Sequence, residues 1–237
     1  MGELERILGQ LDRDGYRAVV LTGADPATFI AHADLRDIVA MAAGHSTSGD
    51  PGSWPRMLRQ IERSSFVTIA AISGLMWGGG LEIALTCGIR VVGETASLRF
   101  PEAMIGILPA VAGHRLLATV PEHVALELLL LAEPFSAQDA LRLGLVNAVV
   151  SDDDVLGRAR AMATRIASLP PATVDAIRDV VMASRGEEKA LRVRQQELFQ
   201  LLVALPATAA SLTAAQSCYD AGGEVSDVFE QGLRGVR

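Results

Sequence analysis

The chain has 237 residues, a formal net charge of −7 at pH 7 and 50% hydrophobic residues. This length fits one large α/β domain, or one domain with a small appendage. The acidic balance, without any block of like charges, disfavours a nucleic-acid-binding protein. Cys87 and Cys218 are the only cysteines and fit no metal spacing, so we expect a reduced chain without a metal.

An uncharged stretch from Ser64 to Leu81 approaches the length of a transmembrane helix. Its serines, its threonine and its four glycines instead predict a buried strand followed by a loop. At the N-terminus, Glu3, Glu5 and Arg6 interrupt any apolar region, so no signal peptide is expected. We therefore expect a cytoplasmic protein that does not enter a membrane.

Strand, loop and helix alternate through the first half of the sequence. Such alternation predicts a parallel sheet with helices outside it. The expected elements are a helix at 4–11, a strand at 17–22, a loop at 24–33, a helix from 34 to about 43, a loop at 44–54, a helix at 55–63, strands at 67–72 and 89–93, and a short strand at 96–100.

After Val120 the pattern becomes mostly helical, with a short extended piece at 145–150. Ser136 is a good N-cap candidate for one of these helices. We expect an α/β core over residues 1–150 and a C-terminal helical region over residues 151–237. Breaks between the later helices are expected at 170–171, 185–186, 206 and 222–223.

Three glycines, Gly78–Gly80, precede a short apolar helix that contains Glu82. Glycines allow a sharp turn and a close approach by another group, and the first amides of a helix lack intrahelical acceptors. This combination predicts a hole for an anion, with Glu82 on the same helix face as Gly79. Two simpler interpretations stay open at this point: the glycines form only a tight turn, and Glu82 pairs with Arg90 or Arg99.

Five segments, in this order, resemble the crotonase (enoyl-CoA hydratase/isomerase) family. No single motif is decisive, but five motifs in this order are a strong signal. The segments are Arg17–Gly23, Phe29–Leu35, Ile69–Gly74 with Gly78–Glu82, Phe100–Glu102 with Gly106–Pro109, and Phe135–Ala140 with Gly144–Asn147.

The resemblance implies a crotonase-like (ClpP/crotonase) parallel-sheet fold and chemistry on an acyl-CoA thioester. The family stabilises a thioester enolate with two backbone amides, which here would be those of Ala33 and Gly79. Its pair of glutamates, for water and the α-carbon proton, aligns with Glu82 and Glu102. Because both carboxylates have apolar neighbours in sequence, we expect at least one raised pKa.

The resemblance also implies a set of residues that bind the substrate: Ala31, Asp34, Leu35, Arg36, Gly78, Pro101 and Gly106. Two of them have simpler interpretations. Asp34 has the chemistry of a helix N-cap, and Arg36 is either close to the CoA phosphates or a solvated surface arginine.

The expected reaction is the reversible syn addition of water to a 2-enoyl-CoA. Coenzyme A is the substrate carrier, no other cofactor is expected, and the resemblance implies a homotrimer or hexamer. Two alternatives stay open: double-bond isomerisation with one glutamate moving the proton, and a non-catalytic scaffold subunit with the same fold.

Two departures from the family motivate the scaffold alternative. Family members open with an N-terminal β-hairpin, whereas the sequence from Met1 resembles the helix that follows it. His32 stands where the family has a glycine, which places a bulky side chain beside the first expected amide donor. That side chain either narrows the CoA channel or adds a polar group to the site.

Overall fold

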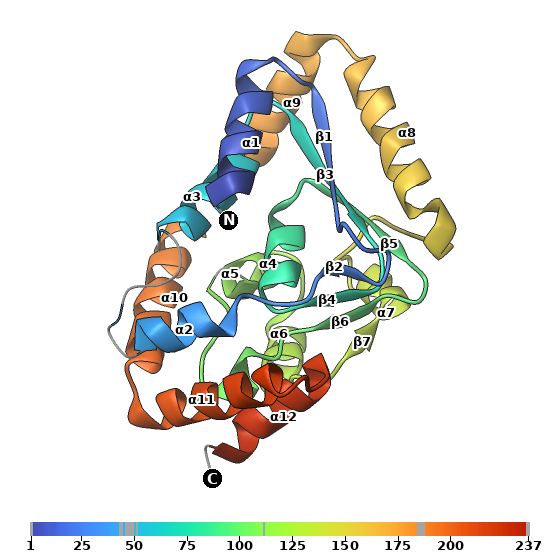
Figure 1. Ribbon diagram of the computed structural model, residues 1–237. Helices are drawn as coiled ribbons and strands as arrows, with labels where there is room; N and C mark the ends of the chain where they lie inside the picture. The colour runs from blue at the N-terminus through green and yellow to red at the C-terminus, as the bar shows by residue number, and fades with distance from the viewer. Residues whose placement is uncertain are drawn as a thin grey trace.

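The computed structural model describes residues 2–42, 45, 50, 52–110, 112–183 and 188–235. Two four-stranded sheets lie at its centre, with helices around them (Figure 1). The first sheet has the order β1-β3-β5-β8 and is parallel throughout; the second has the order β2-β4-β6-β7, with only the β6–β7 pair antiparallel. The strands are β1 (Ala18–Thr22), β2 (Thr28–Ile30), β3 (Val67–Ile72), β4 (Leu75–Trp77), β5 (Ile89–Gly93), β6 (Ser97–Arg99), β7 (Phe135–Ser136) and β8 (Ala148–Val150).

Helices surround both sheets, and α10 to α12 lie together at the C-terminal end of the chain (Figure 1). The α-helices are α1 (Gly2–Arg13), α2 (Leu35–Ala42), α3 (Ser53–Arg63), α4 (Gly79–Thr86), α5 (Ala112–Leu117), α6 (Glu122–Leu130), α7 (Ala137–Arg142), α8 (Val155–Ala167), α9 (Pro171–Ala183), α10 (Glu188–Val203), α11 (Pro206–Asp220) and α12 (Val225–Gly235). Two 3₁₀ helices, η1 (Glu102–Ile105) and η2 (Asp152–Asp154), complete the set.

The chain passes repeatedly from the first sheet to the second. Strands β1, β3 and β5 of the first sheet are followed directly by β2, β4 and β6 of the second. Because β2 and β4 are parallel neighbours, the segments that leave their carboxyl ends also become neighbours. Those two segments carry His32–Ala33 and Gly78–Gly79, which brings both expected amide donors to one edge of the second sheet.

Strand β3 is buried on both of its faces. Ala70 and Ile72 belong to the main core, whereas Ile69 and Ala71 belong to a second cluster. In that second cluster they meet α8, which covers the outer face of the first sheet. Burial on both faces explains why this strand is apolar without alternation, as expected of a parallel sheet.

A third apolar cluster joins the C-terminal helices to the second sheet. Phe229 of α12 and Leu212 of α11 are buried against Trp77 of β4 and Ile105 of η1. The helical region that begins near residue 151 is therefore shared between two cores, α8 on the first sheet and α11 with α12 beside the second. The division of the chain at residue 150 remains a prediction.

Most of the expected elements are confirmed, and the strands at 67–72 and 89–93 agree to the residue. Ser136 is an N-cap, and it forms a capping box with Asp139. The prediction of a continuous loop at 24–33 is wrong, because β2 lies within it, and β4 was not expected. Three-residue strands are too short to show a hydrophobic period, and they form here by pairing with each other.

The loop predicted at 44–54 is wrong at its end, because α3 begins at Ser53 and includes Trp54. Residues 44, 46–49 and 51 of that prediction lie outside the described residues, as does the break expected at 185–186. Within the described ranges, no single helix has the length and apolarity needed to cross a membrane. The segments Val193–Val203 and Pro206–Asp220 meet that test only as a pair, and they are bent by 78°.

Candidate active site

The glycine turn packs the start of α4 directly onto the end of β2. Gly78 precedes α4 with φ +48°, a left-handed conformation that residues other than glycine rarely adopt. Its amide donates to the carbonyl of Arg99 at 3.0 Å. A Cβ on Gly80 would lie 2.1 Å from the carbonyl oxygen of Ile30. Residue 80 must therefore be glycine for α4 to reach β2 at this distance.

The same packing brings Ala33 and Gly79 together. A Cβ on Gly79 would lie 3.5 Å from the backbone nitrogen of Ala33. Gly79 is the first residue of α4, so its amide has no acceptor within the helix. Among the described residues, the backbone–backbone hydrogen bonds include none donated by either amide. Two neighbouring amides that keep their donor capacity can receive a negatively charged oxygen.

Both glutamates that the sequence singled out are buried. Glu82 lies in the first turn of α4 and is 4% exposed, and Glu102 begins η1 and is 7% exposed. The Oε1 atom of Glu102 lies 3.1 Å from the place of a Cβ on Gly78, which puts this carboxyl beside the glycine turn. Its Oε2 atom is buried and has no hydrogen-bond partner among the described residues.

Burial raises the pKa of Glu102 well above the ordinary value, and the charge of nearby Glu82 raises it further. The expected rise in pKa is therefore found at Glu102. A protonated carboxyl with a free oxygen atom can donate a proton, and a second carboxylate within electrostatic reach can accept one. The two acids thus have the environments that acid–base chemistry requires.

Trp54 lies beside Gly79, and its position in the sequence gave no sign of this. Its Cη2 atom is 3.1 Å from the place of a Cβ on Gly79. Its side chain is half-buried against the main core, from a position in the first turn of α3. The sequence offered only an aromatic residue at the end of an expected loop, and nothing local connected it to a glycine 25 positions later.

Asp34 and Arg36 interact with each other at the start of α2. The Oδ1 atom of Asp34 accepts the amide of Arg36 at 2.9 Å and the Nε of its guanidinium at 3.3 Å. Asp34 is therefore a helix cap, and the Arg36 side chain is 66% exposed. Both line a cavity of about 200 Å³, together with His32, Ala33, Leu35, Gln216 and Tyr219.

Of the other residues expected to bind substrate, only Pro101 has a described contact with the glycine turn. Pro101 is buried with its Cδ atom 3.7 Å from the place of a Cβ on Gly78, so it belongs to the glycine turn. Ala31 is half-buried just after β2. Leu35 is 3% exposed and packs in the third apolar cluster. Gly106 ends η1, and its carbonyl accepts the hydroxyl of Thr208 at 3.1 Å, so it contacts α11.

The two arginines named as possible partners of Glu82 both bind backbone carbonyls. Arg90 donates to the carbonyls of Cys87 and Leu145, at 2.8 Å and 2.5 Å. Arg99 donates to the carbonyl of Ala132, lies 5.0 Å from the centre of the Trp77 ring, and has a guanidinium nitrogen 3.8 Å from Glu230. Burial lowers the pKa of Arg99, and this side chain joins β6 to α12.

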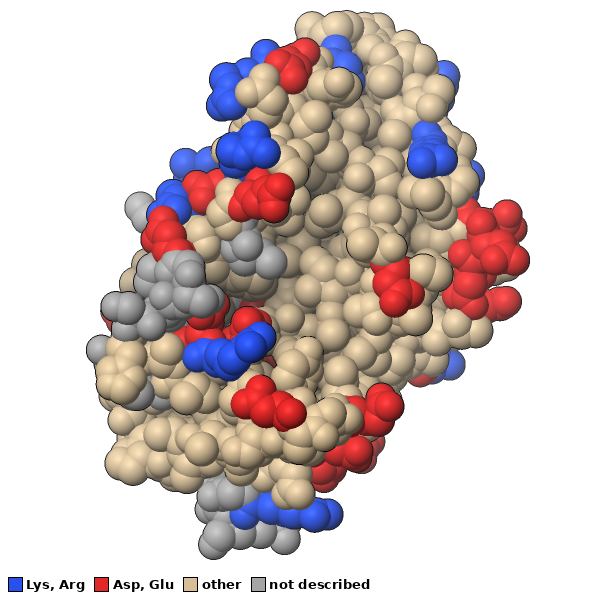
Figure 2. Space-filling model, in the orientation of Figure 1, with Lys and Arg blue, Asp and Glu red and all other residues tan. Residues whose placement is uncertain are grey.

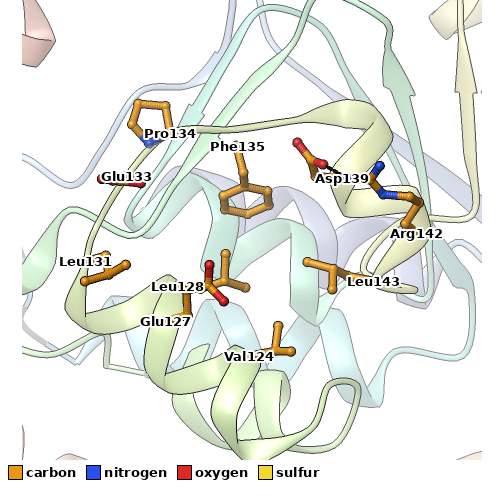
Figure 3. A pocket seen from close by; sticks show the side chains of 10 residues that line it. All are labelled: Val124, Glu127, Leu128, Leu131, Glu133, Pro134, Phe135, Asp139, Arg142 and Leu143. Atoms are coloured by element: carbon orange, nitrogen blue, oxygen red, sulfur yellow. Dashed lines mark hydrogen bonds and ion pairs between the residues drawn. The ribbon is translucent and has the colours of Figure 1, made fainter.

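A larger cavity, of about 330 Å³, lies between α6, β7 and α7. In Figure 3, Phe135 and Leu128 point into it, and the ion pair of Asp139 and Arg142 lies at one side. None of the residues expected in the active site lines it. In the part of the chain that the structure describes, no cluster of three His, Cys, Asp or Glu side chains could hold a metal ion.

Comparison with known proteins identifies the family of this chain. The family model described as enoyl-CoA hydratase/isomerase matches residues 1–214. The chain belongs to the enoyl-CoA hydratase/isomerase family. Its fold is accordingly crotonase-like: it superposes on a putative enoyl-CoA hydratase from Streptomyces avermitilis with a TM-score of 0.83 and 26% identity, over 99% of this chain and 87% of the other.

Other members of the family are similar in sequence. A short-chain-enoyl-CoA hydratase from Clostridium acetobutylicum is 34% identical over 175 residues, 73% of this chain and 66% of the relative. A carnitinyl-CoA dehydratase from Proteus mirabilis matches with the same identity and coverage. The structure of a carnitinyl-CoA hydratase from Mycobacterium avium has a TM-score of 0.78 and 31% identity, over 94% of this chain and 85% of that one. The chain thus matches about two thirds of the length of these curated relatives.

Proposed function

We propose that this protein catalyses the reversible addition of water to a 2-enoyl-CoA thioester. One observation carries the proposal: two amides with free donor capacity, those of Ala33 and Gly79, lie beside a buried pair of carboxyl groups. The similarity to hydratases and dehydratases that act on CoA thioesters supports it.

In the proposed mechanism, Glu82 takes a proton from water as the water oxygen bonds to the β-carbon. The electrons of the double bond move onto the thioester oxygen, where the amides of Ala33 and Gly79 stabilise the enolate charge. Glu102 then gives its proton to the α-carbon, which completes the addition. Coenzyme A only carries the acyl group in this scheme, and the proposal assigns no further cofactor.

The raised pKa of Glu102 supports this division of roles, because it favours the protonated form that gives its proton to the α-carbon. The reverse reaction uses the same groups with the roles exchanged, so the deprotonated Glu102 removes the α-proton. Isomerisation of the double bond would need only one of the two carboxyl groups.

A spectrophotometric screen of 2-enoyl-CoA substrates of different chain length tests the proposal, with product analysis for a 3-enoyl-CoA in parallel. Glu82→Gln and Glu102→Gln should each lower hydration by about 10²- to 10⁴-fold, the usual contribution of a positioned acid or base. Glu94→Gln, which changes an exposed carboxylate, is the matched control and should keep the parental rate.

If the parent hydrates an enoyl-CoA and both buried variants retain that rate, the assignment of the two acids is wrong. Conversion of 3-enoyl-CoA without hydration would favour the isomerase. A parent chain that neither binds CoA nor turns over any enoyl-CoA would favour the non-catalytic scaffold.

The proposal includes a cytoplasmic homotrimer or hexamer. Figure 2 shows a largely uncharged face over the sheets, with the charged side chains gathered at its margins. Exposed leucines on α6 and just after it, Leu126, Leu130 and Leu131, add apolar surface elsewhere. Apolar surface of this kind is typical of subunit interfaces. Light scattering at several protein concentrations measures the assembly directly, and a monomer at all of them would contradict this part of the proposal.

A further inference from the structure

His32 holds the residue that carries the first proposed amide donor. Its Nδ1 atom lies 2.5 Å from the carbonyl oxygen of Ala33. A carbonyl oxygen can only accept, so Nδ1 carries the hydrogen. Ala33 is thus joined to His32 twice. The peptide bond links its nitrogen to His32, and the His32 ring binds its carbonyl oxygen. Such a contact restricts the rotation of Ala33 and so the direction of its N–H.

The His32 ring is itself held by the two C-terminal helices. It makes an edge-to-face contact with Tyr219 of α11, with ring centres 5.5 Å apart and planes at 84°. It makes a second one with Phe229 of α12, at 5.8 Å and 88°. Edge-to-face pairs of this geometry are favourable for aromatic rings. The position of the imidazole is therefore set from outside the loop that carries it.

Phe229 links the two amide donors. Besides His32, it contacts Trp77, with ring centres 6.3 Å apart, and it is 2% exposed. His32 directly precedes Ala33, and Trp77 precedes Gly78–Gly79. One buried ring of α12 therefore lies against His32, two residues after the end of β2, and against Trp77, the last residue of the neighbouring strand β4.

We propose that His32 is a positioning residue, which aims the Ala33 amide at the thioester oxygen and is held in place by Tyr219 and Phe229. This inference rests on the proposed function, because it concerns the amide that would stabilise the enolate. A correctly oriented donor stabilises the charged enolate more than the uncharged bound substrate. If the Ala33 amide loses its orientation, kcat should therefore fall more than KM changes.

Two isosteric variants isolate the hydrogen bond. His32→Asn and His32→Leu both remove the aromatic contacts, but only asparagine has an N–H close to the place of Nδ1. We expect His32→Leu to lower kcat by about tenfold, less than the effect of deleting an oxyanion donor, with KM within about twofold of the parent. His32→Asn should recover most of that loss. His123→Leu, at an exposed histidine of α6, is the control for the substitution itself.

The absorbance of a bound substrate analogue reports directly on the hydrogen bonds that the amide donors make to its carbonyl. A 3-aryl-2-enoyl-CoA has a conjugated carbonyl whose absorbance shifts to longer wavelength when hydrogen bonds polarise it. The shift on binding should shrink in His32→Leu and return in His32→Asn, while thermal unfolding follows the fold of each variant. A merely structural role would change stability equally in both variants and leave the shift of the folded protein unaltered.

Equal kcat and equal absorbance shifts in the two variants would overturn the inference, whether both match the parent or both fall below it. Should His32→Leu fail to fold, His32→Phe, which keeps a ring but has no donor, takes its place with the same expectation. A parent chain that shows neither hydration nor an absorbance shift would instead overturn the proposed function, and the inference would fall with it.

Discussion

The carboxyl group of Glu102 occupies the space that a side chain on Gly78 would fill. Its Oε1 atom lies 3.1 Å from the place of a Cβ at residue 78, and the positive φ of Gly78 turns the chain at that point. The glycine therefore serves both the turn into α4 and the position of the acid. This proximity places Glu102 where burial and the charge of Glu82 act on it together.

The first prediction concerns stability and pH. The pKa of Glu102 is raised in the folded protein, whereas in the unfolded chain it is near the ordinary value of 4.5. Below that pH the carboxyl is protonated in both the folded and the unfolded protein, so its burial costs no free energy of ionisation. As the pH rises toward the folded pKa, the unfolded chain releases its proton first, so the free energy of unfolding falls by up to about 1.4 kcal/mol per pH unit.

Glu102→Gln removes this titration, so the variant should be more stable than the parent at neutral pH, and its advantage should shrink on acidification. Urea denaturation from about pH 5 to about pH 8 measures the difference. Glu94→Gln is the control, as in the activity assay. A constant difference between Glu102→Gln and the parent over this range would show that the carboxyl is not held protonated by the fold.

The second prediction concerns the contact between α4 and β2. Gly80→Ala puts a Cβ 2.1 Å from the carbonyl of Ile30, so α4 must move away from β2. We expect a loss of about 1 to 3 kcal/mol in the free energy of unfolding, the usual cost of overpacking. The hydration rate should fall as well, because the movement separates Gly79 from Ala33.

Gly157→Ala is the matched control, because a Cβ there meets no atom within 4 Å and the position is an exposed one in α8. It should stabilise the protein by about 0.5 to 1 kcal/mol, through the helix propensity of alanine. Equal effects of the two substitutions would mean that the Gly80 contact is not tight in solution.

The third prediction concerns Ala132, which has φ +52° and is the only non-glycine residue with positive φ in the described part of the chain. The left-handed conformation costs an alanine about 1 to 2 kcal/mol, and glycine adopts it freely. Two costs oppose this relief: the greater entropy of glycine in the unfolded chain, and the loss of a buried methyl group, because Ala132 is 1% exposed in the third apolar cluster. Ala132→Gly should therefore change the free energy of unfolding by less than about 1 kcal/mol. Ala161→Gly, at an exposed position in α8, should instead destabilise the protein.

Thermal and urea unfolding of both alanine variants measure the two changes. A loss of more than about 1.5 kcal/mol in Ala132→Gly would mean that no strain is relieved, and so that the conformation at residue 132 is not left-handed in solution.

The fourth prediction concerns Trp54 and the size of the acyl group. The Cη2 atom of Trp54 lies 3.1 Å from the place of a Cβ on Gly79, so the ring is beside the proposed site of the thioester. Trp54→Ala should raise kcat/KM for a bulky or long 2-enoyl-CoA relative to a short one by about tenfold, the scale at which pocket contacts discriminate. The ratio between two substrates is measured on one preparation, so any loss of active protein cancels. An unchanged ratio would place the acyl group elsewhere.

Much of this molecule can be predicted from local sequence. The apolar run at 67–72 fixes β3 because a strand buried on both faces needs no polar positions. Ser136 and Asp139 lie three positions apart, so their capping box is readable without a structure. Gly78–Gly80 with Glu82 indicated a turn into a helix that carries a buried carboxylate, and both features are present.

Other features depend on contacts between distant segments. The strands β2 and β4 have three residues each and exist because they pair with each other. Trp54 beside Gly79, and Phe229 between His32 and Trp77, join positions that no local period connects. The sequence by itself determined the backbone turns, the buried strands and the acids, since these follow from conformational preference and hydrophobic pattern. Only the tertiary structure decided which rings surround the amides and how strongly the pKa of Glu102 is shifted, because packing and burial depend on the whole chain.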